Sequence, residues 1–430
     1  MNDLFKQRVI EYFKEDANKY LDLLNEPCTQ GFFLNTAKAP KEEIFNIIDF
    51  HFQASSLTNY SFYHSIDYIG KTKAYDLGLI YPQEIAASIP STKINTDGVK
   101  LVVDLCSAPG GKTINVLNKL SFDTLCICND VSYKRALTLS SNLERLGLDN
   151  VVITSKDTNV LSKQLENCAD LVILDAPCSG EGMIRKYPEI LEEYSLNNIN
   201  NLADIQKGLL EDAYRILKGD GQLLYSTCTY SFEEDEHQII NFLSKHDDME
   251  LVDLGEGYAS TLKGTIKLSP LTNTEGQFIC LMHKKGDIHN LLKPLKAVKE
   301  KIVDDFINDN LRINNYYLYK NDNRYYMSLI PLPDLKNNVV RCGIYVGDII
   351  NKRFEPNHSF YRSNSLKGKY IYTYELSNVE YDKYILGYEL NVDLGNHYYL
   401  VTYKDLSLGF GKCSNKQLKN KYPKGLRRTN

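Results

Sequence analysis

Five apolar segments alternate with helical patterns between residues 99 and 227, and this alternation constrains the fold more than any other feature of the chain. The apolar segments are VKLVVDL (99–105), TLCICND (124–130), VVITSKD (151–157), LVILDAP (171–177) and GQLLYST (221–227). Strands separated by helices pair in parallel through right-handed crossovers, and strands that are apolar throughout are buried on both faces. We therefore predict an α/β fold with a doubly wound, mostly parallel sheet covered by helices.

Apolar periodicity predicts the connecting helices at 114–120, 133–147 and 205–219. In the last of these, four apolar residues share one face, and Gly219 fits the position just after a helix end. The four residues are Ile205, Leu209, Ala213 and Ile216.

The remaining segments predict smaller flanking domains. Residues 1–90 combine helical patterns with polar and aromatic segments, as expected of a small α+β region. A helix is predicted at 291–307, followed by short strands at 316–331, and the rest of the chain has the strand-like runs of a small β-rich barrel or sandwich. The predicted parts are 1–90, 91–285, 286–335 and 336–430.

Composition limits the class of protein. Hydrophobic residues make up 43% of the chain and charged residues 24%, which is typical of globular proteins and excludes disordered, collagenous and coiled-coil chains. No segment predicts a signal peptide or a membrane span, and the ten cysteines are too sparse for a disulfide scaffold. We expect a cytoplasmic protein with reduced thiols, acting as a monomer.

The segment DLCSAPGGKT (104–113) follows the first strand and predicts a cofactor loop. Gly110 and Gly111 allow a tight turn and close approach of a ligand to the backbone. A triphosphate-binding loop would need glycine at position 106, where Cys106 stands, and the dinucleotide fingerprint G-x-G-x-x-G is also missing. Asp130 and Asp157 end the next two strands, where carboxylates take ribose hydroxyls and a purine edge. Together these features predict S-adenosylmethionine, although either acid alone is more typical of a turn or a helix cap.

Two cysteines and an acid follow the fourth and fifth strands. Asp175 and Cys178 lie in DAPCSGEGM (175–183), and Cys228 lies in STCTY (226–230). If the two strands are neighbours, these side chains meet at the cofactor end of the sheet. A thiolate that adds to C6 of cytosine makes C5 nucleophilic, and a carboxyl group near N3 stabilises the adduct. The residues alone do not say which thiol attacks and which assists release.

A zinc site built from Cys106, Cys178 and Cys228 is the metal alternative. No Cys-x-x-Cys pair and no nearby histidine supports it, so we expect no metal.

The motifs CSAPGGK, DAPCSGEG and STCTYS resemble those of the Sun-related family of RNA 5-methylcytosine methyltransferases. Bacterial members that modify 16S ribosomal RNA are the most similar, also through GLIYPQE (78–84), RFEPNHS (353–359) and the C-terminal LGFGK and KNKYPKGLRR. The resemblance implies a Rossmann-like methyltransferase core, an N-terminal RNA-binding domain and a C-terminal PUA-like RNA-binding domain. It implies that Cys228 is the nucleophile and that Cys178 assists product release, while the chemistry of the adduct assigns the N3 role to Asp175. The cofactor contacts that it implies are Cys106, Ser107, Ala108, Pro109, Gly110, Gly111, Lys112, Asp130, Asp157 and Asp175.

The chain departs from the family pattern at three positions. Ser107 replaces the commoner alanine, Ile85 stands where proline is usual, and Asp235 stands where asparagine is usual. None of these changes removes a predicted catalytic group.

RNA must be held by local patches, because the formal net charge is −5. Arg185 and Lys186, after the fourth strand, are candidate phosphate contacts, and surface charges opening a helix are the alternative. The tail predicts further contacts, with a solvated tail as its alternative; its candidates are Lys412, Lys421, Lys424, Arg427 and Arg428. Two other functions stay open, namely the same methylation on transfer RNA and a non-catalytic RNA-binding factor for ribosome assembly.

Overall fold

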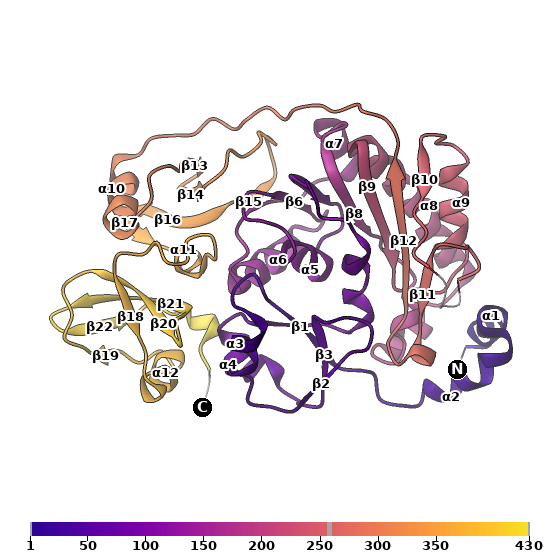
Figure 1. Cartoon of the computed structure of the whole chain (residues 1–430), viewed down its shortest axis with the longest axis horizontal. Helices are drawn as coiled ribbons and strands as arrows, with labels where there is room; N and C mark the ends of the chain where they lie inside the picture. The colour runs from indigo at the N-terminus through magenta and orange to yellow at the C-terminus, as the bar shows by residue number, and fades with distance from the viewer. Residues whose placement is uncertain (1, 256–259, 429–430) are drawn as a thin grey trace.

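The central sheet has nine strands, five of them parallel, in the computed structural model of the chain, which describes residues 2–255 and 260–428 (Figure 1). The parallel strands run in the order β7-β6-β5-β8-β9, so the chain reverses its direction of travel across the sheet between β5 and β8. Their bounds are β5 Leu101–Asp104, β6 Leu125–Asn129, β7 Val151–Thr154, β8 Ala169–Asp175 and β9 Leu217–Thr227. All five predicted strands are confirmed.

Antiparallel strands extend this sheet at both edges. Beyond β9 lie β12 Gln277–Lys284 and its neighbours β10 Met249–Leu251 and β11 Ile266–Leu268, and beyond β7 lies β15 Val339–Cys342.

Helices cover both faces of the sheet, as the doubly wound prediction requires. Ile114 of α5 and Leu139 of α6 join the core on one face, while Leu209 of α8 and Ile239 of α9 join the core on the other. The bounds are α5 Gly111–Leu117, α6 Tyr133–Leu146, α7 Thr158–Gln164, α8 Leu196–Ile216 and α9 Glu236–Leu243.

Two details of the predicted helix at 205–219 are wrong. Helix α8 ends at Ile216 and passes directly into β9, so Gly219 lies inside a strand. Ile205 is 53% exposed, whereas the neighbouring Gln206 is buried and donates from its amide to the Pro177 carbonyl and to Glu234.

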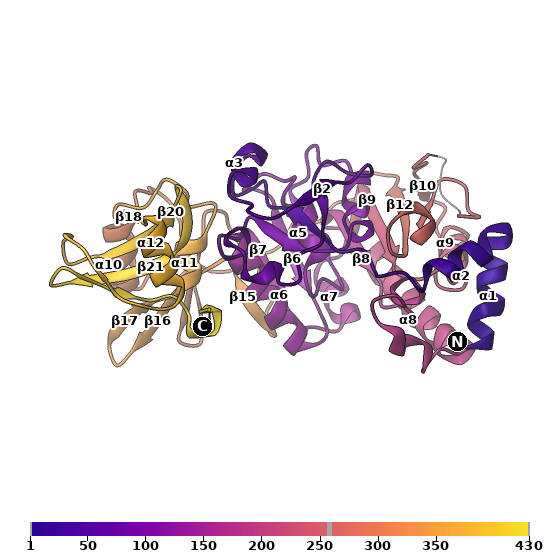
Figure 2. The same cartoon turned by 90° about the horizontal axis from the view of Figure 1, so that it is seen from below.

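The N-terminal 90 residues form two separate units. Helices α1 Asp3–Phe13 and α2 Ala17–Leu23 pack on Ile184, Tyr194 and Tyr230 at one end of the molecule. The four-stranded sheet β2-β3-β1-β4 and the short helices α3 and α4 lie next to the central sheet instead (Figures 1 and 2). Their bounds are β1 Gly31–Leu34, α3 Lys41–Phe45, β2 Phe52–Ala54, β3 Ser61–His64, α4 Lys73–Asp76 and β4 Ile80–Pro82.

The boundary predicted at 335/336 cuts through a single sheet. Strands β13 Tyr317–Asn321 and β14 Arg324–Ser328 pair on with β16 Ile344–Ile350 and β17 Arg353–Pro356. The run VVRCGIYVGDII serves two sheets, because Gly343 turns the chain between β15 and β16. Its φ of +76° and the Met327 carbonyl, 2.6 Å from where a Cβ would stand, both require glycine there.

The predicted helix at 291–307 is shorter than its apolar pattern. Helix α10 covers only Lys301–Asn310, and the preceding segment crosses over the central sheet in extended form (Figure 1). Pro294 disfavours a helix before it, because proline restricts the preceding residue and lacks the N–H of a helix interior. The residues after it are held extended, since the N–H groups of Leu295 and Val298 donate to the carbonyls of Leu332 and Leu318.

A five-stranded sheet of order β18-β20-β21-β22-β19 completes the C-terminal part, which lies at the opposite end of the molecule from α1 (Figure 2). Its apolar face packs against the N-terminal sheet in one core. The elements are α11 His358–Arg362, β18 Thr373–Glu375, α12 Asn378–Ile385, β19 Leu390–Asn391, β20 Tyr398–Tyr403, β21 Leu406–Ser414 and β22 Gln417–Asn420. Among the described residues, none of the helices combines the length and hydropathy needed to cross a bilayer.

Candidate active site

The predicted cofactor loop, Asp175 and the two predicted cysteines lie at the carboxyl ends of β5, β8 and β9. Strands β8 and β9 are parallel neighbours, with Asp175 opposite Ser226, so the segments that follow them emerge together. This edge of the sheet includes the point between β5 and β8 where the strand order changes direction, because β6 and β7 lie on one side of β5 and β8 and β9 on the other. Open α/β sheets bind their ligands at such a point.

The two predicted thiols are in direct contact. The Sγ atoms of Cys178 and Cys228 are 3.3 Å apart, and the backbone N–H of Cys228 donates to Cys178 Sγ at 3.3 Å. The structure therefore brings together two cysteines that are 50 positions apart in the sequence.

Asp175 is fixed beside the thiols through both carboxylate oxygens. The Ser226 hydroxyl donates to Oδ1 at 2.6 Å, and the Lys112 ammonium lies 3.0 Å from Oδ2. Lys112 also donates to Gln277 Oε1 at 3.2 Å, which orients its ammonium between the cofactor loop and strand β12. Ser226 belongs to the motif STCTYS. Gln277 has no signal in the sequence, because it belongs to β12, whose pairing with β9 is not apparent from local sequence patterns.

Electrostatics distinguish the two sulfurs. The pKa of Cys228 is lowered, chiefly by the hydrogen bond from the Cys178 thiol and further by the charge of Lys112, against burial and the charge of Asp175. The same hydrogen bond raises the pKa of Cys178, and burial raises it further. Cys228 is therefore the sulfur that ionises first, which makes it the stronger candidate for a nucleophile.

Replacing Lys112 by methionine is expected to raise the pKa of Cys228, because the thiolate loses a nearby cation while burial and Asp175 remain. The rate of Cys228 alkylation rises with pH through that pKa, so the whole profile should move to higher pH in the variant. Measuring alkylation by mass spectrometry in the protein without cofactor separates this effect from cofactor binding. Lys134→Met, on the exposed side of α6, is the matched control and should leave the profile in place. An unchanged profile in Lys112→Met would contradict this role.

The predicted cofactor loop lies between β5 and α5. Gly110 adopts a left-handed conformation with φ +119° and leads directly into α5. Ser107 donates from its hydroxyl to the carbonyl of Asn129 at 2.8 Å, which ties the loop to β6. The segment 106–112 therefore turns at the edge of the sheet where Asp175 and the thiols lie.

Asp104, at the end of β5 beneath this loop, was not predicted from the sequence. Its Oδ2 accepts the Thr113 hydroxyl at 2.6 Å, whereas its Oδ1 is buried without a partner among the described residues. Burial raises its pKa to about 7. The sequence signal was its place at the end of a strand, which it shares with the predicted acids.

The two predicted strand-end acids differ in environment. Asp130 is buried, accepts the Ser132 N–H at 3.0 Å and forms an ion pair with Arg135 at 3.2 Å. Asp157 is exposed and caps α7 through the Asn159 N–H at 2.9 Å.

Buried acids behind the thiols hold the two cysteine motifs together. Glu234 accepts the backbone N–H of Ser179 at 2.9 Å, and Glu181 accepts the Thr229 hydroxyl and the Tyr230 N–H at 3.0 Å each. Both acids lie inside or next to the cysteine motifs. The sequence does not predict that they connect the two motifs, because these contacts depend on the packing of the chain.

The carboxylate of Asp235, where asparagine is usual, is balanced by a neighbouring cation. Its buried carboxylate accepts the Thr227 hydroxyl at 2.6 Å and lies 3.1 Å from the Lys267 ammonium. The fold can therefore accommodate an acid at this position, close to the segment that carries Cys228.

The structure gives Arg185, a predicted phosphate contact, a protein partner instead of a place on the open surface. Its side chain is only 6% exposed and forms a 2.6 Å ion pair with Glu275, and it also donates to the carbonyls of Pro27 and Thr274. The guanidinium thus joins the segment after α2 to the chain before β12. Lys186 is exposed and stays a candidate.

Breaking this buried pair by Arg185→Met is expected to lower the free energy of unfolding by about 3–5 kcal/mol, because it leaves the Glu275 carboxylate buried and unpaired. Urea unfolding measures the loss, and the double variant Arg185→Met/Glu275→Gln should recover part of it. A single variant as stable as the unaltered protein, but with weakened RNA binding, would restore the phosphate-contact interpretation.

The predicted basic tail is folded rather than free. Lys412 lies in β21, Arg427 donates to the Tyr422 carbonyl at 3.2 Å, and Arg428 forms a 2.6 Å ion pair with Asp76 next to the N-terminal sheet. The ammonium-bearing side chains that stay exposed in this region include those of Lys412, Lys421 and Lys424.

Two family models match the chain. The model of the 16S rRNA methyltransferase RsmB/F covers residues 92–283, and that of the methyltransferase RsmF PUA domain covers residues 371–428. Together they span more than half of the chain.

Curated relatives named ribosomal RNA small subunit methyltransferase F align over most of its length. The protein of Shewanella piezotolerans is 25% identical over 98% of this chain and 97% of its own length, and that of Aeromonas salmonicida is 29% identical over 84% and 82%. Among solved structures, a methyltransferase homolog protein from Pyrococcus horikoshii is 27% identical with a TM-score of 0.58, over 66% of this chain and 95% of its own. NSun6 from the same organism, solved with SFG, shows the same fold at 21% identity and a TM-score of 0.58, over 66% of this chain and 98% of its own.

The resemblance drawn from the motifs is thus confirmed over the core and the C-terminal domain alike. The chain combines a Rossmann-like methyltransferase core with a C-terminal domain that matches the PUA domain of RsmF, and it belongs to the RsmB/F family of 16S rRNA methyltransferases.

Proposed function

We propose that this protein methylates C5 of cytosine in 16S ribosomal RNA through a covalent bond between Cys228 and C6 of the base. The observation that carries the proposal is the contact of the two sulfurs at 3.3 Å beside an Asp175 carboxylate that is held on both oxygens. Methylation of most other RNA positions needs no thiol, whereas C5 of cytosine is too weak a nucleophile without one.

The methyl donor of the family is S-adenosylmethionine, which when bound supplies an electrophilic methyl group to the activated C5. The residues at the sheet edge fit it. The Gly110 turn leaves the first N–H groups of α5 without a side-chain cap, and the unpartnered oxygen of Asp104 suits a ligand ammonium. We assign the amino-acid arm to residues 106–112, the ribose to Asp130 and the adenine to Asp157, with Asp175 at the reacting end.

Cys228 starts the reaction as a thiolate. Its sulfur forms a bond to C6, and the electron pair of the C5–C6 double bond moves towards C5 and the N3 side of the ring. N3 becomes more basic and takes up a proton that the Lys112 ammonium gives to the Asp175 carboxylate, 3.0 Å away, and that Asp175 passes on to N3. Ser226 and Gln277 keep this pair aligned.

Cys178 completes the turnover. The Cys178 thiol first releases its own proton to water, which is the one proton that the overall reaction releases. Once C5 carries the methyl group, the Cys178 thiolate takes the C5 proton, the S–C6 bond breaks and the electron pair restores the ring double bond. N3 returns its proton, and Cys228 leaves as a thiolate, the form that its lowered pKa favours. The raised pKa of Cys178 suits a group that takes up a proton.

The RNA must present an unstacked base, because both faces of C6 are covered in a helix. Flipping a base costs a few kcal/mol, which backbone contacts have to offset. Lys186 and the exposed lysines of the C-terminal domain, Lys412, Lys421 and Lys424, are assigned to the backbone.

The test is methyl transfer from radiolabelled S-adenosylmethionine to an unmodified 16S transcript, to small ribosomal subunits and to transfer RNA. Nucleoside mass spectrometry should find the label as 5-methylcytidine in the ribosomal substrates. Label in another nucleoside would overturn the chemistry, label only in transfer RNA would overturn the substrate, and no label in any substrate would favour a non-catalytic assembly factor.

A further inference from the structure

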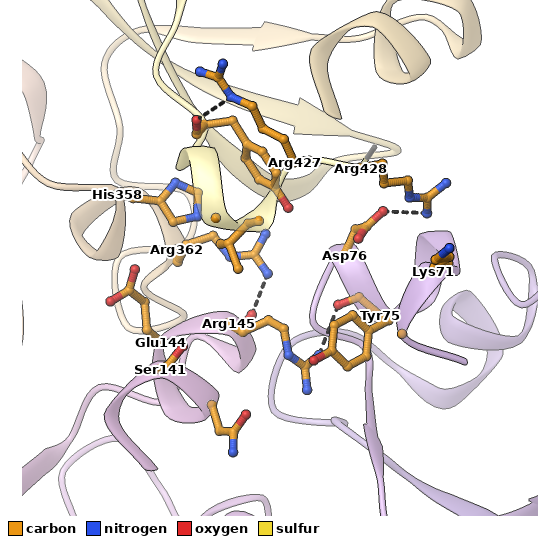
Figure 3. Close-up of a pocket in the computed structure, with 15 residues that line it drawn as sticks. Lys71, Tyr75, Asp76, Ser141, Glu144, Arg145, His358, Arg362, Arg427 and Arg428 are labelled. Carbon is orange, nitrogen blue, oxygen red and sulfur yellow. Dashed lines mark hydrogen bonds and ion pairs between the residues drawn. The ribbon is translucent and has the colours of Figure 1, made fainter. Parts of the chain in front are cut away.

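A cavity of about 350 Å³ lies where three parts of the chain meet (Figure 3). Lys71, Tyr75 and Asp76 come from the N-terminal region, Asn142, Glu144 and Arg145 from α6, and the remaining walls from α11 and the C-terminal segment. The cavity is separate from the thiols and the cofactor loop, none of whose residues line it.

Its lining is strongly cationic. Five basic residues and two acids line it, and one of these acids, Asp76, is already paired with Arg428 at 2.6 Å. The other acid, Glu144, has its pKa raised by burial, which favours its neutral form. The basic residues are Lys71, Arg145, Arg362, Arg427 and Arg428.

Two of these cations are buried with donors to spare. Arg145 is 8% exposed and uses only Nη1, which donates to the carbonyls of Tyr75 and Ile80, while its Nε and Nη2 have no hydrogen-bond partner among the described residues. Arg362 is 1% exposed and its Nε is likewise unpartnered. Within residues 2–255 and 260–428, no carboxylate lies within ion-pair distance of either.

Buried cations without an anion are costly, and guanidinium groups match phosphate oxygens in geometry. One residue in the wall of the cavity also contacts the predicted cofactor loop, residues 106–112. Asn142 lines it and donates to the Pro109 carbonyl of the cofactor loop at 2.9 Å.

We propose that this cavity binds a phosphate group of the substrate RNA, held by the buried Arg145 and Arg362, with Lys71 and Arg427 in the wall adding positive charge. The RNA as source of the phosphate rests on the proposed function, while the anion site itself does not. The exposed Lys421 and Lys424 lie next to the lining residues in sequence and would contact the neighbouring phosphates.

The test uses the full-length protein and the double variant Lys71→Ala/Arg427→Ala, which leaves the buried Arg145 and Arg362 in place to keep the fold. The control, Lys285→Ala/Lys301→Ala, removes the same charge from exposed positions elsewhere. Binding of an unmodified 16S transcript is measured by fluorescence anisotropy at several salt concentrations, and binding of inorganic phosphate by thermal shift. Thermal unfolding without ligand confirms that the variants are folded.

We expect the cavity variant to bind RNA about tenfold more weakly, with the slope of log affinity against log salt reduced by about one, and the control to change little. The phosphate-induced thermal shift should shrink in the same variant. A lost phosphate shift with unchanged RNA binding would overturn RNA as the source and leave a site for a small anion. Unchanged RNA and phosphate binding would overturn the site.

The binding measurements do not require methyl transfer. Failure of the proposed function would therefore appear as absent 5-methylcytidine with the binding effects intact. Failure of this inference would appear as normal methylation with unaffected binding. The conservative double variant Lys71→Arg/Arg427→Lys should restore RNA affinity, which a merely structural role of the two side chains would not predict.

Discussion

Replacing Cys228 by serine is expected to lower the rate of methyl transfer at least about a thousandfold. A hydroxyl has a far higher pKa than a thiol and is a much weaker nucleophile, so C6 is no longer attacked and C5 is not activated. Serine is nearly isosteric with cysteine, so the fold should persist. The measurement is single-turnover transfer of labelled methyl groups to the 16S transcript at saturating cofactor.

Cys168→Ser is the matched control for this variant. Cys168 is half-buried, its pKa is raised to about 11 by burial, and its thiol donates to the Glu166 carbonyl at 3.3 Å. It should retain full activity. Label transfer that survives in Cys228→Ser at a comparable rate would show that the nucleophile is another group.

Replacing Cys178 by alanine is expected to trap the enzyme on its RNA. The Cys228 thiolate still adds and C5 is still methylated, but the group that takes the C5 proton is gone, so the S–C6 bond persists. The adduct should appear as a denaturation-resistant shift of the protein band that requires both RNA and S-adenosylmethionine. The experiment is run above the ordinary thiol pKa of about 8.5, because the variant also loses the hydrogen bond that lowers the pKa of Cys228.

The double variant Cys178→Ala/Cys228→Ser is the control, and its band should not shift. Normal turnover in Cys178→Ala, with no adduct, would show that release does not depend on this thiol.

The sequence could predict the central sheet and the meeting of the two cysteines because both follow from local features. Apolar strands separated by helices determine parallel pairing, and the motifs around Asp175, Cys178 and Cys228 directly follow neighbouring strands. Side chains at the carboxyl ends of such strands must lie at one edge. That placement needed no knowledge of the rest of the chain.

Features that depend on partners distant in the sequence could not be predicted. The burial of Arg185 depends on Glu275, 90 positions away, and the alignment of Lys112 depends on Gln277 of an antiparallel strand. The run 339–350 is predicted as one strand, whereas the structure divides it at Gly343, where the chain turns from a pairing with β7 to a pairing with β14. The cationic cavity could not be predicted for the same reason, since its walls come from three separate parts of the chain.

The covalent role of Cys228 is tested most directly by peptide mapping of a trapped complex. RNA that carries 5-fluorocytidine cannot lose its C5 substituent as a proton, so the adduct stops before release. After incubation with S-adenosylmethionine and digestion, mass spectrometry should find the methylated fluoropyrimidine on the peptide that contains Cys228. Attachment to Cys178, or a complete lack of adduct in an enzyme that methylates ordinary RNA, would contradict this assignment.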